Sequence, residues 1–362
     1  MKITLGEVGT YINGYAFKPS DWGTRGLPII RIQNLTNQNI VPNYFDGPYN
    51  PKFEVNKGDI LIAWSGSLGI HIWQKNRALL NQHIFRVEFN KCDIDKMYFY
   101  YAVKYNIHKM LHLTHGATMK HIIKSDFEQI VVPYPSLDVQ AKISKILNYL
   151  EQNIINYRNI LLKLELLIKS RFDEVFNLPL VNTPLSKYIK ELKSGKSLAG
   201  ESYNINKVLK TGAVSFDYFN NKEVKNLPIA YTPLENHRVN VGDVIISRMN
   251  TAELVGAAGY VWSVDDNVYL PDRLWNAILD ENINPIFVWQ LLIHKKTKIQ
   301  IQRIATGTSG SMKNISKQKF LDIKVPWVPI NTQNELSNLV CQINKLKSDV
   351  QKSIDETQLL MD

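Results

Sequence analysis

Two short stretches of the chain carry residue types that could do phosphate or metal chemistry. Ser194-Gly195-Lys196-Ser197 imitates the end of a phosphate-binding loop, but Lys190 stands where the upstream glycine is required. His108 and His112 have the spacing of a zinc-protease helix, yet Lys109 occupies the place of the essential glutamate. Neither pattern therefore supports nucleotide hydrolysis or zinc-dependent proteolysis.

Other catalytic signatures are equally incomplete. Glu191-Leu192-Lys193 and Asp322-Ile323-Lys324 resemble the carboxylate-x-lysine part of a nuclease site, but no second carboxylate is convincingly placed. The Asn-Pro-Pro-aromatic signature of amino-methyltransferases does not occur. The two cysteines, Cys92 and Cys341, are too few for a disulfide framework or a zinc site. We expect a non-catalytic chain that holds no cofactor or metal.

The polar loops suit recognition instead, because they combine hydrogen-bond donors with glycines that let the backbone approach a ligand closely. Arg and Lys suit guanine edges or phosphates, Asn and Gln suit adenine, and Ser and Thr take several roles. A solvated loop side chain is the alternative for each residue alone. The candidate contacts are Arg31, Gln33, Asn34, Ser65, Ser67, Thr118, Lys120 and His121 in the first half, and Lys193, Lys196, Lys210, Thr211, Arg248, Asn250, Arg273, Ser309, Ser311 and Lys313 in the second.

The positive charge lies in two separate regions. Residues 1–137 hold 15 Lys or Arg against 10 Asp or Glu, and residues 178–331 hold 19 against 13. The intervening segments, 138–177 and 332–362, carry only +1 and −2 of the net +10. A polyanion is therefore the expected partner of both basic regions. A modest basic excess is also common in chains rich in Lys and Asn, so charge alone does not decide the matter.

The two basic regions repeat one pattern. Val55–Ile62 matches Val239–Ile246, each a Gly-Asp turn that leads into a short apolar strand and then a polar loop, at 65–69 and 247–251. Three further blocks align in the same order: 80–85 with 270–275, the helical region from Tyr98 with that from Phe287, and 119–133 with 312–326. The pattern predicts two mixed α/β domains with short strands, and a helix such as Asp95 to Leu113 in the first.

A long helix is predicted from Asp138 to Asn177, which contains no Pro or Gly. Its apolar residues recur every 3.5 residues, as in a coiled coil: Ile143, Leu147, Leu150, Ile154, Tyr157, Leu161, Leu164 and Ile168. Such a helix is about 60 Å long at 1.5 Å per residue. Asp138 is a good N-cap type, and Pro179 prevents continuation beyond Asn177. The helix is therefore expected to connect two bodies held well apart.

The same period returns between Asn331 and Asp362, with Lys347 and Thr357 at two positions of the seam. Two such seams predict an antiparallel helix pair within one chain, and two unrelated amphipathic helices are the alternative. Outside the first seam, Ile146, Ile160 and Leu167 form a second apolar stripe, which Leu339 and Leu360 continue on the second helix. Two helices cannot bury both stripes, so we expect further helices from a partner, with packing on the globular regions as the alternative.

In this order of motifs the chain resembles the specificity subunits of type I restriction-modification systems. The residues that carry the resemblance are the Gly-Asp blocks at Gly58 and Gly242, the Gly-rich loops that lead to Met-Lys-x-Ile, and the junctions from Pro133 to Gln140 and from Pro326 to Gln333. The resemblance implies a first target-recognition domain at 1–137, a central spacer helix at 138–177, a second domain at 178–331 and a C-terminal spacer helix at 332–362. Each domain would read one half of a split double-stranded DNA target.

The same resemblance implies partners that do the chemistry. They are two methyltransferase subunits, which bind S-adenosylmethionine, and restriction subunits that use ATP and Mg²⁺ to translocate and cut DNA. A stand-alone nuclease or methyltransferase with duplicated domains, or a coiled-coil scaffold that binds no DNA, is the alternative. No run of 18 apolar residues occurs and the start lacks a signal-peptide core, so we expect a cytoplasmic protein without a membrane partner.

Overall fold

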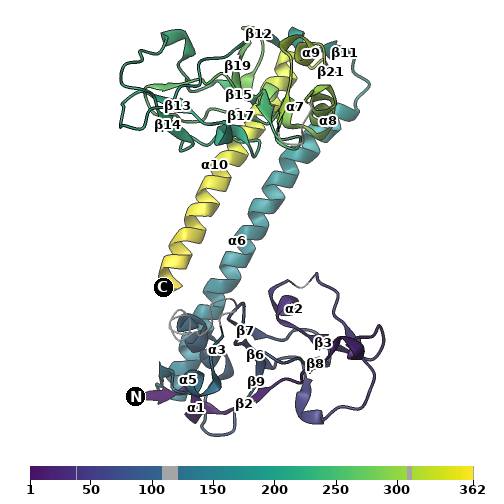
Figure 1. Cartoon of the computed structure of the whole chain (residues 1–362), viewed down its shortest axis with the longest axis vertical. Coiled ribbons are helices and arrows are strands. Elements are labelled where there is room, and N and C mark those ends of the chain that lie inside the picture. Colours follow the sequence, from purple (N-terminus) through teal and green to yellow (C-terminus); the bar gives the residue numbers. More distant parts are fainter. Residues whose placement is uncertain (38, 108–120, 308–311, 362) are drawn as a thin grey trace. The chain divides into compact units, whose positions relative to one another are not determined.

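The computed structural model describes residues 1–37, 39–107, 121–307 and 312–361. It divides into two compact units, each described here by itself (Figure 1). Unit 1 comprises residues 1–156 and 354–362, and unit 2 comprises residues 157–353. Mixed helix and sheet is confirmed in both units. Among the helices that the structure describes, none combines the length and apolarity needed to cross a membrane.

Unit 1 is built on two four-stranded sheets. The first is antiparallel, with the order β2 (Thr10–Asn13), β9 (Ile84–Glu88), β6 (Ile60–Ala63) and β7 (Gly69–Ile72). The second has the order β4 (Tyr44–Phe45), β3 (Leu27–Ile30), β8 (Ala78–Leu80) and β5 (Glu54–Val55), and β3 is parallel to β8. Strand β1 (Lys2–Thr4) pairs with β10 (Val131–Pro133). The helices are α1 (Leu5–Val8), α2 (Ile32–Thr36), α3 (Lys96–Tyr105), α5 (Lys124–Glu128) and the first half of α6 (Leu137–Asn177).

Unit 2 repeats the order and directions of these strands, except that its second sheet lacks the fourth strand within the described residues, and this confirms the predicted repeat. Its antiparallel sheet has the order β12 (Ile189–Lys193), β19 (Leu274–Leu279), β15 (Val244–Ser247) and β17 (Ala258–Tyr260). Its second sheet has the order β14 (Val224–Asn226), β13 (Lys207–Leu209) and β18 (Val268–Tyr269), again with one parallel pair, β13 and β18. Strand β11 (Asn182–Pro184) pairs with β21 (Lys324–Pro326), and β16 (Met249–Asn250) pairs with β20 (Lys313–Asn314). The helices are the second half of α6, α7 (Pro285–Ile293), α8 (Lys295–Ile304), α9 (Lys317–Leu321) and α10 (Ile330–Met361) up to residue 353.

The Gly-Asp turns explain why the repeat is visible in the sequence. Gly58 and Gly242 have φ angles of 92° and 98°, a left-handed conformation that glycine adopts without a steric penalty. In each turn the aspartate that follows accepts a 2.8 Å hydrogen bond from a backbone amide, Asn56 N to Asp59 and Asn240 N to Asp243. The turn then delivers the chain into β6 or β15, where all four residues are buried.

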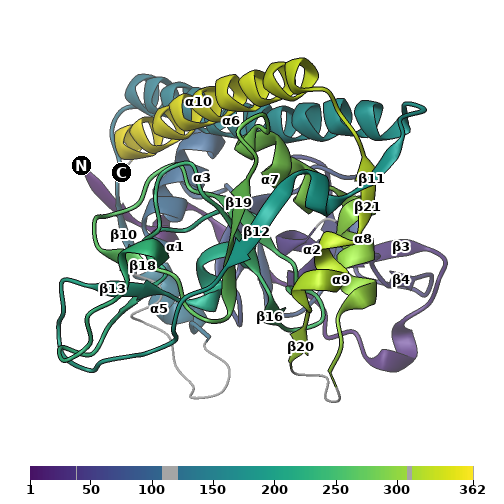
Figure 2. The same cartoon turned by 90° about the horizontal axis from the view of Figure 1, so that it is seen from above.

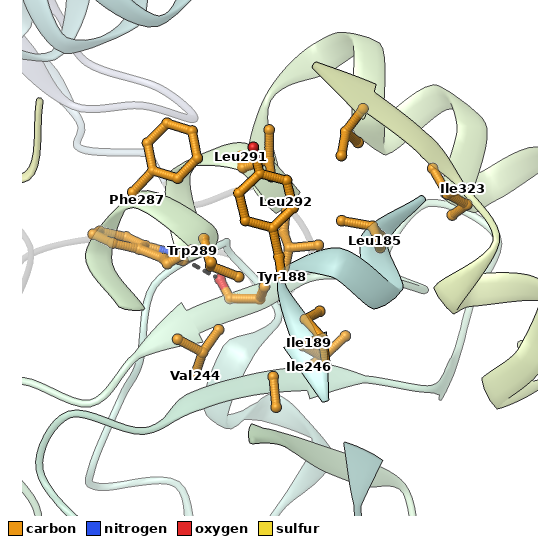
Figure 3. Packing of buried hydrophobic residues seen from close by; sticks show 14 of the residues in the cluster. Leu185, Tyr188, Ile189, Val244, Ile246, Phe287, Trp289, Leu291, Leu292 and Ile323 are labelled. Atoms are coloured by element: carbon orange, nitrogen blue, oxygen red, sulfur yellow. Dashed lines mark hydrogen bonds between the residues drawn. The ribbon is translucent and has the colours of Figure 1, made fainter. Parts of the chain in front are cut away.

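The main core of unit 2 packs α7 against the antiparallel sheet (Figure 3). Tyr188, just before β12, lies 6.0 Å from the ring of Phe287 in α7. Its hydroxyl donates to the Pro326 carbonyl at 2.8 Å and accepts from the Val328 amide at 2.8 Å. Burial raises the pKa of Tyr188 to about 12, so the phenol stays neutral and can donate. This tyrosine therefore fixes the segment between β21 and α10.

The predicted helix seam matches the burial pattern. All eight seam positions of α6 are buried or half-buried, whereas Ile146, Ile160 and Leu167 of the second stripe are 59%, 41% and 42% exposed. Within unit 2, the seam residue Lys347 of α10 reaches Glu165 of α6 at 2.8 Å. A polar residue at a seam position favours one register of the helix pair over others. What covers the second stripe stays a prediction.

Both long helices begin slightly before the predicted residues. Helix α6 starts at Leu137, so Asp138 lies in its first turn and is not the N-cap, and α10 starts at Ile330. The reason is that the first helical hydrogen bonds run from Gln140 N to Ser136 O, at 2.9 Å, and from Gln333 N to Pro329 O, at 3.0 Å. The predicted end at Asn177 is correct.

A buried glutamine ties each long helix to its own globular body. The Gln140 side chain accepts from the Asp95 amide at 2.9 Å and donates to the Pro135 carbonyl at 2.8 Å. In unit 2, Gln333 accepts from the Asn284 amide at 3.0 Å and donates to the Val328 carbonyl at 2.8 Å. The two glutamines are 1% and 0% exposed.

A serine one turn further along completes the same contact. Ser144 donates to the Asp95 carboxylate at 2.9 Å, and Ser337 donates to the Asn284 side-chain oxygen at 2.7 Å. Asp95 and Asn284 are also the N-caps of α3 and α7. We call this set, Gln140 and Ser144 with Asp95, or Gln333 and Ser337 with Asn284, the glutamine clamp. It joins the start of one helix to the start of another through satisfied buried polar groups.

Replacing Gln333 by Ala is expected to lower the free energy of unfolding of unit 2 by about 2 kcal/mol, because the Asn284 amide and the Val328 carbonyl would both lose their partner in a buried place. Chemical denaturation measures the change. Gln342→Ala, at an exposed position of the same helix, is the matched control and should change stability by less than about 0.5 kcal/mol. Equal effects from the two variants would show that the clamp is not what holds α10 to its unit.

Candidate nucleic-acid interface

Three chain segments cross at the end of β15 in unit 2. The Arg248 amide donates to the Arg273 carbonyl at 3.1 Å, and the Arg248 carbonyl accepts from the Ile315 amide at 3.0 Å. Next to this crossing, β16 pairs with β20, and Asn314 forms two further backbone hydrogen bonds with Thr306, both 2.9 Å. Figure 2 shows β16 and β20 at the end of unit 2 away from α10.

Unit 1 contains the same crossing at the end of β6. The Trp64 amide donates to the His83 carbonyl at 3.1 Å, and the Trp64 carbonyl accepts from the Ile122 amide at 3.0 Å. Ser65 bridges to His121 as β16 does to β20. We call this arrangement the three-segment junction. Its central residues are Trp64, His83 and His121 in unit 1, and Arg248, Arg273 and Asn314 in unit 2.

The junction corrects one detail of the sequence alignment. The polar loops at 65–69 and 247–251 do not start at equivalent residues, because the strand pairing sets Ala63 opposite Ile84 and Ser247 opposite Leu274. Trp64 and Arg248 are therefore the equivalent residues. The blocks that flank the loops already imply this register. Trp64 and His83 were missed as candidates. Their signal was position, because Trp64 follows the first aligned strand and His83 lies within the aligned block 80–85.

Arg248 is half-buried and held in a defined orientation. Its guanidinium lies 5.7 Å from the centre of the Trp275 ring, and Nε donates to the Asn314 side-chain oxygen at 3.4 Å. No other hydrogen bond or ion pair joins this guanidinium to a residue within the described ranges. The terminal amino groups are thus available as a planar pair of donors, which suits a base edge or a phosphate.

The equivalent position in unit 1 offers different chemistry. The Trp64 ring stacks 5.6 Å from that of Phe85, and its single N–H donates to Asn13 at 3.1 Å. His83 has a left-handed φ of 72° and lies 4.9 Å from the Trp64 ring. Burial lowers the pKa of His83, and the charge of His121 lowers it further. At neutral pH this side of the junction therefore presents aromatic rings and a neutral imidazole.

The other predicted contact residues of unit 2 near the junction differ in exposure and in their hydrogen bonds. Lys193 ends β12, half-buried, and Arg273 is exposed. Lys313 is half-buried and donates to the Gly307 carbonyl at 3.0 Å. Asn250 accepts from the Thr251 amide at 2.9 Å, so its side chain braces its own loop. Arg273 and Lys313 thus lie on the chain segments that form the junction, and Lys193 lies on β12, which pairs with β19.

A second pair of candidates also occupies equivalent positions. Arg31 follows β3 and Lys210 follows β13, and each is the N-cap of a short helix, α2 or the 3₁₀ turn at Thr211–Val214. Arg31 lies 4.8 Å from the ring of Trp22, and Lys210 lies 3.7 Å from Glu223. Thr211 is half-buried at the start of that turn. A cation at this corner is therefore a feature of both units.

Two candidates have structural roles that keep them from solvent. Asn34 is 5% exposed, accepts from the Arg31 amide at 3.0 Å and donates to the Ile40 carbonyl at 3.2 Å. Ser65 is 3% exposed. Direct contact of these side chains with a ligand would require the loops to rearrange. Gln33, Ser67 and Lys196 are exposed, and Thr118, Lys120, Ser309 and Ser311 lie outside the described residues.

The stretch that imitates a phosphate-binding loop has a packing function. A Cβ at Gly195 would lie 1.9 Å from the Leu270 carbonyl oxygen, so only glycine fits there. The neighbouring Ser197 is hydrogen-bonded to Asp272. Gly14 occupies the same place in unit 1, with 2.0 Å to the Asn81 oxygen. Within the residues that the structure covers, no three His, Cys, Asp or Glu side chains form a group that could hold a metal ion.

The chain is similar to proteins of known family. Residues 1–166, just under half of the chain, match the family model described as the type I restriction modification DNA specificity domain. The specificity subunit of the EcoBI type I restriction enzyme from Escherichia coli is 28% identical over 152 residues, which is 41% of this chain and 32% of that protein. Residues 1–166 are thus similar to the type I restriction-modification specificity family.

Other relatives match over a larger part of the chain. The MjaVIII specificity subunit of Methanocaldococcus jannaschii is 24% identical over 320 residues, 82% of this chain and 75% of that protein. This chain thus spans about a third of the EcoBI subunit and three quarters of the MjaVIII subunit. The crystal structure of a type I restriction-modification S subunit from M. genitalium matches all of this chain and 94% of its own length, with a TM-score of 0.62 at 16% identity. At that identity the likeness concerns the fold.

Lys313 provides a test of phosphate contact at the three-segment junction of unit 2. If its ammonium meets a backbone phosphate, Lys313→Ala should weaken DNA binding about equally on any sequence and reduce the slope of log affinity against log salt by about one unit. Titration of labelled duplexes at several salt concentrations measures both. Lys319→Ala, an exposed lysine on α9 of the same unit, is the control. A loss confined to one base position would mean base reading instead.

Proposed function

We propose that this chain is the DNA-recognition subunit of a type I restriction-modification complex, and that each unit reads one half of a bipartite double-stranded target. The observation that carries the proposal is the repeated three-segment junction. Both units build it with the same backbone hydrogen bonds but present different side chains from it. A single backbone frame that carries two sets of contact groups is what reading two different half-sites requires.

Charge and rigidity support the same proposal. Both globular regions carry the basic excess of the chain, which favours a polyanionic partner. The glutamine clamp fixes each long helix to its globular body, so the helices can act as spacers and not as flexible tethers. In this proposal Arg273 and Lys313, on the segments of the junction, contact phosphates, and the guanidinium of Arg248 contacts a base.

We further propose that catalysis belongs to partner subunits. Methylation would be done by two methyltransferase subunits that bind S-adenosylmethionine, and cleavage by restriction subunits that use ATP and Mg²⁺. The exposed stripe formed by Ile146, Ile160 and Leu167 supports a docking role for α6, because a single-sided coiled coil would not need it. In this proposal the chain itself holds no cofactor and remains in the cytoplasm with its DNA.

Exchange of one recognition region tests the proposal. Replacing residues 1–137 with the corresponding region of another family member should change one half of the methylated target and leave the other half intact, because each unit has its own core. The measurement is methylation mapping of genomic DNA by the assembled complex. Replacing 178–331 should change the opposite half. Alteration of both halves by either exchange would contradict the two-reader arrangement, and methylation by the chain alone would contradict its non-catalytic role.

A further inference from the structure

Trp64 and Arg248 occupy the same position of the junction but differ in the hydrogen-bond donors that they offer. Arg248 presents two terminal amino groups that bond to no residue in the described part of the chain. Trp64 has one donor, and Asn13 already accepts from it. The frame around both residues is the same, so the difference lies in the side chains and not in the backbone.

Arg248 is better suited to a base edge than to a phosphate. Its guanidinium is held by the Trp275 ring and by the Asn314 side chain, and Asn314 is itself held by two backbone hydrogen bonds to Thr306. A fixed planar pair of donors matches two acceptors at one spacing and orientation, as guanine O6 and N7 provide. The more exposed cation Arg273 is freer to follow a phosphate backbone.

We propose that Arg248 reads one guanine in the half-site recognised by unit 2, and that Trp64 makes no hydrogen-bonded base contact at the equivalent position of unit 1. This inference rests on the proposed function and goes one step further, because it names the residue and the base. It predicts an asymmetry between the half-sites. One base pair of the unit 2 half-site depends on a single side chain, with no counterpart in unit 1.

The test uses the full chain assembled with the methyltransferase subunits encoded with it. The complex methylates a library of duplexes with randomised sequence, and sequencing of the methylated molecules gives the preference at every position. Arg248→Met keeps an unbranched stem against Trp275 and removes the donors. It is expected to reduce the preference for guanine at one position of one half-site about 10- to 100-fold and to leave the other positions unchanged.

Two further variants complete the experiment. Arg248→Gln, whose amide suits adenine, is expected to shift the preference at that same position from guanine toward adenine. Arg303→Ala, an exposed arginine on α8 of unit 2, is the matched loss of one positive charge and should leave every preference as it was. Melting temperature and assembly with the methyltransferase subunits establish that each variant is folded.

The outcomes separate this inference from the function on which it rests. If the unaltered complex selects no bipartite target, the proposed function fails. If the target is bipartite and Arg248→Met leaves the guanine preference intact, or weakens all sequences equally, only the assignment of Arg248 fails. Should Arg248→Met not assemble, Arg248→Gln decides alone: a changed preference at a single base supports the assignment, and an unchanged pattern overturns it.

Discussion

The glutamine clamp is the interaction on which the rest of the structure depends. A helix that leaves a globular body through a short connection can pivot about that connection unless a buried contact prevents it. Gln140 and Gln333 prevent it by bonding to the backbone on both sides of the corner, the preceding loop and the start of a neighbouring helix. Because these groups are buried, a tilt of the helix would leave several of them without partners, which costs more than their net contribution when paired.

The strand that precedes each clamped helix is also held in both units, although by different side chains. In unit 2 the Pro326 carbonyl is held by Tyr188, just before β12, and in unit 1 the equivalent Pro133 carbonyl is held by Tyr98, from α3. The donor thus comes from a different element in each unit, yet the carbonyl is satisfied in both. What has been retained through the duplication is the satisfaction of a backbone group, and the side chain that provides it has changed.

The sequence predicted the features that depend on a regular spacing of apolar residues or on a backbone conformation that only glycine readily adopts. The seam of α6 follows from its 3.5-residue spacing, and the repeat follows from glycines such as Gly58 and Gly242, whose left-handed turns tolerate little else. The strand order was not predictable, since pairs such as β3 with β8 join residues far apart in the chain. Only part of the glutamine clamp could be predicted. The two glutamines align in the sequence repeat, but the carbonyls that accept from them, those of Pro135 and Val328, lie in irregular segments without a sequence signature.

The candidate contact residues were harder to predict for a related reason. At the three-segment junction the hydrogen bonds that join the segments are made by the backbone, and a backbone hydrogen bond depends little on the side chain that accompanies it. The same backbone frame therefore carries tryptophan in unit 1 and arginine in unit 2. Asn34 shows the converse, because an amide that looked suited to a base is committed to its own loop. A fold whose backbone bonds form the frame, and whose side chains make the contacts, can read different sequences without a change of backbone. In such a fold, the position of a residue in the structure identifies a base-contacting residue better than its type does.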